Sequence, residues 1–131
     1  MTPPHAPDKP PAITLYGIPN CDTVKKSRAW LTEHGVSYTF HDFKKQGVPA
    51  AELAKWVAAL GWEALVNKKG TTWRKLSAQS QAAVTDAASA QALMLREPSV
   101  IKRPVLDNGS PDGKHISAGF APEIWAIWAK L

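Results

Sequence analysis

A strand pattern, a helix pattern and a second strand pattern follow one another within residues 12–42, and this order constrains the fold more than any other feature. The run AITLYG at 12–17 is apolar and β-branched and ends in a glycine, which indicates a buried strand. Apolar residues then recur at helical spacing from Asp22 to His34, and Gly35 supplies the stop. The run VSYTFHDF at 36–43 alternates as a strand does. A unit of this kind predicts an α/β fold.

The rest of the chain predicts a helical insertion, short strands and a closing helix. Helical patterns run from Pro49 to Gly61 and, with loops between them, on to Pro98. The run SVIKRPVLDNG at 99–109 predicts two short strands or one strand broken by Pro104, and GKHISAG at 113–119 predicts another. From Pro122 a final helix is expected to pack its larger apolar residues onto the sheet; these are Ile124, Trp125, Ile127, Trp128 and Leu131.

Length and composition predict one folded unit. The chain has 131 residues, of which 44% are hydrophobic and 21% charged, close to globular averages. Five prolines within the first twelve residues indicate a disordered tail over 1–11, followed by a single domain over 12–131. One cysteine allows no internal disulfide and no cysteine-built zinc site, which suits a reducing cytoplasm, so we expect the protein there. We also expect a monomer.

The net charge of +5 favours anionic partners, but the basic residues are dispersed in pairs along the chain. No nucleic-acid motif accompanies them, so we do not expect a nucleic-acid face. No apolar run is long enough to span a membrane.

Cys21 stands in the turn between the first predicted strand and helix. Backbone N–H groups at a helix start, together with the helix dipole, stabilise a thiolate there. If Cys21 caps the helix, the amides of Thr23 and Val24 point at its sulfur. Lys25 and Lys26 are the local cations, whereas Asp22 opposes ionisation of the thiol. A lone cysteine is often a small buried hydrophobe, but the polar turn around this one favours a reactive thiol.

Three separated motifs resemble the arsenate reductase-like (ArsC) family, and most of all its Spx/MgsR/YffB branch. They are LYGIPNCDTVKKSRAWL at 15–31, NKKGTTWRKL at 67–76 and REPSVIKRPVL at 96–106. The resemblance is closest to YffB-type proteins and covers residues 12–131. It implies a thioredoxin-like fold with a mixed sheet, in the order βαβ, helical insertion, ββ(β)α.

The resemblance also implies roles for particular residues. Cys21 is the nucleophile, and Arg103 is the anion-binding arginine before a proline, Pro104, that is usually cis. Three departures from the family pattern bear on activity. Gly17 stands where arsenate reductases of the family carry a histidine, Asn67 replaces an arginine with Lys68 and Lys69 beside it, and Val24 occupies the second thiol position of the Spx-like switch.

These observations favour a glutathione-dependent thiol reductase that works through a single cysteine. The alternatives are an arsenate reductase, acting with glutathione and glutaredoxin on an oxyanion, and a non-catalytic Spx-like regulator that binds RNA polymerase. We expect glutathione as co-substrate, no bound cofactor and no metal. The expected site has Cys21 as catalytic residue; Arg103, Lys69, Asn20, Thr23 and Lys25 as ligands of glutathione or substrate; and Pro104 and Pro19 as structural residues.

Overall fold

The computed structural model describes residues 12–130. The expected tail over 1–11 and the last residue, Leu131, lie outside the described residues. In chain order the elements are β1 (Thr14–Gly17), α1 (Asp22–Glu33), β2 (Thr39–Asp42), α2 (Phe43–Gln46), α3 (Ala50–Leu60), α4 (Trp62–Leu65), α5 (Thr71–Lys75), α6 (Ala78–Ala82), α7 (Ala87–Arg96), the 3-10 turn η1 (Pro98–Val100), β3 (Val105–Asp107), β4 (Ile116–Ala118) and α8 (Pro122–Trp128).

The four strands form one mixed sheet in the order β2-β1-β3-β4. β1 pairs in parallel with β2, and the crossover between them is α1, as a parallel pair requires. β3 pairs antiparallel with both β1 and β4. The sheet thus confirms the predicted α/β class and its βαβ opening.

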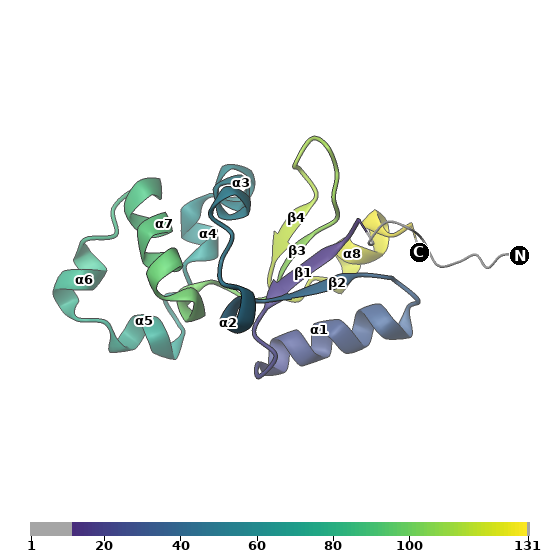
Figure 1. The fold of residues 1–131 in the computed structure, drawn as a ribbon, viewed down its shortest axis with the longest axis horizontal. Coiled ribbons are helices and arrows are strands. Elements are labelled where there is room, and N and C mark those ends of the chain that lie inside the picture. Colours follow the sequence, from purple (N-terminus) through teal and green to yellow (C-terminus); the bar gives the residue numbers. More distant parts are fainter. Residues whose placement is uncertain (1–11, 131) are drawn as a thin grey trace, which may run out of the picture.

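Alternating residues of the strands build two cores, one on each face of the sheet. Leu15 and Leu106 face Leu31 of α1 and Trp125 of α8. Tyr16 and Val105 face the opposite way, into a larger core with α3, α4, α5 and α7. The helices α3 to α7 gather at one end of the molecule, away from α1 and α8 (Figure 1). Helices therefore cover both faces of the sheet.

The closing helix packs on one side only, which corrects part of the expectation for it. Trp125 is buried and its indole Nε1 donates a 2.8 Å hydrogen bond to Ser117 Oγ. Ile124 and Ile127, however, are 44% and 75% exposed. Residues three apart share one face of a helix, so the side that buries Trp125 turns both isoleucines outward.

The segment before β3 also differs from the expectation, which was two short strands or one strand broken by Pro104. Residues 98–100 form the turn η1, and Ile101 makes only an isolated bridge with Val66. Proline at the first position pre-sets the turn, and the regular strand begins only after Pro104. His115 was expected within a strand, but it lies directly before β4.

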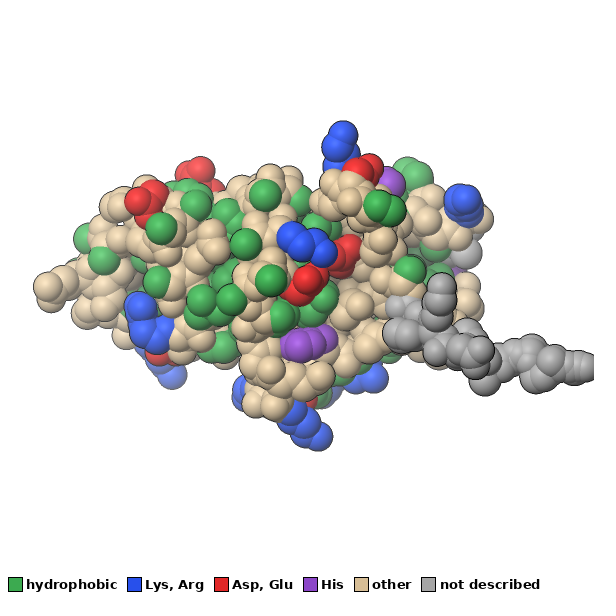
Figure 2. Space-filling model, turned by 45° about the horizontal axis from the view of Figure 1, so that its top comes forward, with side chains coloured by type: hydrophobic (Ala, Val, Ile, Leu, Met, Phe, Trp, Pro, Cys, Tyr) green, Lys and Arg blue, Asp and Glu red, His purple; other side chains and the backbone are tan. Residues whose placement is uncertain are grey.

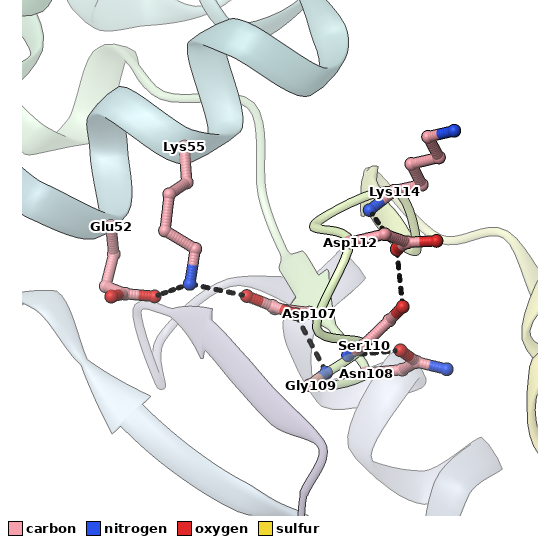
Figure 3. Close-up of polar contacts among 8 residues, drawn as sticks. All are labelled: Glu52, Lys55, Asp107, Asn108, Gly109, Ser110, Asp112 and Lys114. Atoms are coloured by element: carbon pink, nitrogen blue, oxygen red, sulfur yellow. Dashed lines mark hydrogen bonds and ion pairs between the residues drawn. The ribbon is translucent and has the colours of Figure 1, made fainter.

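A charged network ties the helical end to the sheet (Figure 3). Lys55 of α3 lies 3.1 Å from a carboxylate oxygen of Glu52 and 3.9 Å from one of Asp107 in β3.

Burial, then the charges of Glu52 and Asp107, raise the pKa of Tyr16 to about 12. On the face drawn in Figure 2, lysine and arginine side chains stand apart from one another, which agrees with the dispersed charge of the sequence.

Candidate active site

Cys21 is the N-cap residue of α1 and directly follows the turn that leaves β1. Its backbone is extended (φ −137°, ψ 123°), and its carbonyl accepts the first helical hydrogen bond, from the Lys25 N–H, at 2.9 Å. Cys21 as a whole residue is partly exposed, and it is a free cysteine. The sequence predicted this placement from the strand pattern and the helix start on either side of the turn.

The surroundings of Cys21 favour its ionised form. Partial burial opposes the thiolate, but the backbone N–H of Val24, the Arg103 guanidinium and the backbone N–H of Thr23 outweigh it and lower the pKa of the Cys21 thiol below its usual value. Cys21 makes no side-chain capping hydrogen bond of regular geometry at the start of α1. At neutral pH the thiolate fraction of Cys21 is therefore larger than that of an unperturbed cysteine.

Arg103 is held in place by the backbone of its own segment. Its Nη1 donates to the carbonyl oxygens of Ser99 and Ile101, at 2.6 and 3.2 Å. The Arg103–Pro104 peptide bond is cis, as the family resemblance implied. Within residues 12–130, the buried Nε atom of Arg103 has no hydrogen-bond partner. The backbone of its own segment thus fixes the Arg103 guanidinium beside Cys21.

The other predicted site residues in the turn lie around Cys21 at the surface. Pro19, Asn20, Thr23 and Lys25 are all exposed. The Thr23 amide acts on the sulfur, whereas Asn20 and Lys25 make no side-chain hydrogen bond within the described chain. Their roles as ligands remain predictions.

Lys26, the other local cation, lies against an aromatic ring. Lys26 places its Nζ 5.1 Å from the ring centroid of Phe120. Pro104, the second residue with an expected structural role, is buried.

Lys69 lies in a separate hollow beside α4, which we call the lysine hollow. It is lined by Glu63, Ala64, Val66, Asn67, Lys68, Lys69 and Lys102. The sequence alone did not predict that Glu63 and Lys102 lie beside Lys69. The one available signal was that Lys102 directly precedes Arg103, which was expected in the site. Trp73 is only 9% exposed and packs in the core.

No histidine within residues 12–130 is hydrogen-bonded to Cys21. His34 Nδ1 lies 2.8 Å from the Trp30 carbonyl oxygen, and His41 Nε2 lies 2.8 Å from that of Gly47. The thiol therefore relies on the helix start and Arg103 for its ionisation.

The packing at Gly17 shows why a side chain does not fit there. A β-carbon on this residue would lie 2.9 Å from Val24 Cγ2, at the first turn of α1. We expect Gly17→Ala to lower the free energy of unfolding by about 1–2 kcal/mol, because overpacking forces neighbouring atoms to shift. Urea denaturation measures the change. Combining it with Val24→Ala should give a smaller loss than the sum of the two single losses, and strict additivity would contradict this reading.

The lowered pKa of Cys21 has a consequence for stability. An acid whose pKa is depressed by folding stabilises the native state above its unfolded-state pKa, and this contribution disappears as the pH falls through the folded-state pKa. The difference in unfolding free energy between the natural chain and Cys21→Ser should therefore rise with pH across that window. Urea unfolding at a series of pH values tests this, and a difference independent of pH would contradict it.

The sheet order, the cysteine at the end of the first strand and the arginine before a cis proline define a thioredoxin-like α/β protein. The chain belongs to the ArsC family, whose model matches residues 16–127. This finding confirms the resemblance in the three sequence motifs.

Several relatives extend the match over most of the chain. An uncharacterized protein of Haemophilus influenzae is 40% identical over 117 residues, which cover 89% of this chain and 99% of that protein. A solved structure named YFFB (PA3664) protein is 46% identical with a TM-score of 0.80, covering 88% of this chain and 96% of that one. The structure of an arsenate reductase (ArsC) related protein from Brucella melitensis is also 46% identical, with a TM-score of 0.67 and coverage of 97% and 100%.

A more distant relative is a regulator. The global transcriptional regulator Spx of Streptococcus agalactiae is 27% identical over 110 residues, covering 82% of this chain and 76% of that protein. The family thus contains proteins named for different activities, and the choice among them rests on the site itself.

No helix within residues 12–130 is long and apolar enough to cross a membrane.

Proposed function

We propose that the protein is a glutathione-dependent thiol reductase with Cys21 as its nucleophile. The observation that carries the proposal is the partly exposed, free Cys21 at the start of α1, with its pKa lowered by backbone amides and by Arg103. A thiolate attacks disulfide sulfur, whereas a protonated thiol does not. Arg103 adds a fixed positive charge beside the sulfur, which attracts acidic thiols and disulfides.

The reaction cycle needs one protein thiol. The Cys21 thiolate attacks the glutathionyl sulfur of a mixed disulfide, a new S–S bond forms, and the substrate leaves as a thiolate that takes a proton from water. A glutathione thiolate then attacks the glutathionyl sulfur on Cys21. This second step regenerates the Cys21 thiolate and forms glutathione disulfide. One glutathione thiol is therefore consumed for each substrate thiol released, and the other half of the glutathione disulfide comes from the mixed disulfide.

Glutathione fits the resolving role because the chain has no second cysteine. The resolving thiol must therefore come from another molecule. Glutathione carries two carboxylates, which suit a site that contains Arg103 and nearby lysines.

Trapping the intermediate tests the proposal. Incubation of the protein with glutathione disulfide should add one glutathionyl group to Cys21, detected by intact-mass and peptide mass spectrometry, and fresh glutathione should remove it. Arsenate turnover with glutathione and glutaredoxin, without disulfide reduction, would instead favour the arsenate reductase alternative. A protein that gains no adduct would contradict the proposal.

A regulatory function is the second candidate, because Spx regulators are among the relatives. Val24 stands where the Spx-like switch has its second thiol, so a disulfide switch within this chain is not available. Retention of RNA polymerase from a cell extract, together with an unreactive Cys21, would favour the regulator over the reductase.

A further inference from the structure

The lysine hollow is a concave surface that neither Cys21 nor Arg103 lines. Its volume is about 400 Å³, within the range of small-molecule sites. Three lysines, Lys68, Lys69 and Lys102, line it together with one carboxylate, Glu63. The hollow therefore presents an excess of positive charge with a single negative group among it.

These charges are not neutralised by neighbours. Within residues 12–130, the ion pairs closer than 4.0 Å all involve Lys55, so neither the three lysines nor Glu63 has a partner at that distance. Lys68 is positioned by aromatic rings, with its Nζ 5.4 Å from the Trp73 centroid and 5.9 Å from that of Trp62. The hollow thus offers both signs of charge to a ligand.

Lys102 connects the lysine hollow with the thiol site. It precedes Arg103, so their Cα atoms are about 3.8 Å apart. Arg103 acts directly on the Cys21 sulfur. Lys102 also runs beside Gly119, where its Cε lies 3.1 Å from the position of a β-carbon. An extended tripeptide spans roughly 10 Å, which is longer than the Cα–Cα distance between Arg103 and Lys102.

We propose that the lysine hollow binds the γ-glutamyl end of glutathione while its sulfur lies at Cys21. This end carries an α-carboxylate and an α-ammonium on one carbon. The lysines match the carboxylate, and Glu63 matches the ammonium. The inference rests on the proposed reductase function and assigns the part of the co-substrate that this second surface recognises.

Two unreactive ligands test the contributions of the α-carboxylate and the α-ammonium separately. S-methylglutathione keeps both groups and cannot exchange with Cys21, whereas the analogue with glutaryl in place of γ-glutamyl lacks only the ammonium. Isothermal calorimetry on the full chain should show the natural protein binding the deaminated analogue about tenfold more weakly, because a charge-assisted hydrogen bond is lost. Glu63→Gln should weaken the binding of S-methylglutathione by a similar factor and leave the binding of the deaminated analogue unchanged.

The lysines are tested in the same way, with matched controls. The double variant Lys69→Gln/Lys102→Gln should bind both ligands more weakly by about the same factor, because both ligands retain the α-carboxylate. Glu33→Gln repeats the charge change of Glu63→Gln, and the double variant Lys44→Gln/Lys114→Gln repeats that of the lysine variant. These exposed residues lie outside the lysine hollow, so both controls should bind like the natural protein.

Two results would overturn the inference. The first is binding of S-methylglutathione that neither Glu63→Gln nor the lysine variant changes; the proposed reductase function would survive it. The second is no binding to the natural protein, in which case formation of the Cys21 adduct with glutathione disulfide decides separately whether the reductase function stands.

Discussion

Replacing Cys21 with serine is expected to lower glutathione-dependent disulfide reduction by at least about a thousandfold, as the loss of a nucleophile does in other enzymes. The hydroxyl of serine stays protonated at neutral pH, and the amides and guanidinium around it cannot ionise it to a useful extent. The rate of glutathione disulfide formation from a glutathione mixed disulfide, coupled to glutathione reductase, measures the effect.

The fold should tolerate this exchange. Cys21 is a partly exposed cap residue, and serine is a favoured cap, so the thermal midpoint should stay close to that of the natural chain. The matched control is the double variant Cys21→Ser/Ser37→Cys, which restores a thiol at an exposed position away from the site. Recovery of turnover by this control, or unchanged turnover in Cys21→Ser, would show that the position of Cys21 is irrelevant.

Arg103→Ala is expected to produce the second largest loss, about a hundredfold in turnover, a size seen when one preorganised charge-stabilising donor is removed. Without the guanidinium, burial acts on the sulfur with only the Val24 and Thr23 amides against it, so the pKa of the Cys21 thiol should rise. The iodoacetamide alkylation rate, measured against pH, reports this rise independently of turnover.

Two further variants separate charge from geometry at this position. Arg103→Lys keeps the charge but lacks the fork that donates to the Ser99 and Ile101 carbonyls, so it should recover only part of the activity. Arg96→Ala removes an exposed arginine from the last turn of α7 and should leave both the pKa and the turnover unchanged. A normal alkylation profile in Arg103→Ala would contradict the role assigned to Arg103.

Local patterns predicted most of the fold because its elements are set by neighbouring residues. The helix expected from Asp22 to His34 spans Asp22–Glu33, and the strand expected within 12–17 spans Thr14–Gly17. The segment after Pro98 was harder to predict, since Ile101 finds its partner in Val66, far away in the sequence. The two outward isoleucines of α8 could not be assigned either, because an apolar helix pattern does not state which side meets the sheet.

The site divides in the same way. Cys21 was predictable from the turn that contains it. The importance of Arg103 came from the family resemblance, because no local pattern connects residues so far apart in the sequence. The lysine hollow depends on the folded chain, since it brings Glu63 and Lys69 next to Lys102.

The most direct test of the central claim is the alkylation rate of Cys21 as a function of pH in the full natural chain. We expect the rate to reach its plateau with a midpoint below the usual range of a cysteine thiol, because the start of α1 and Arg103 stabilise the thiolate. A midpoint at or above that usual range would contradict the account, since Cys21 would then be mostly protonated at neutral pH.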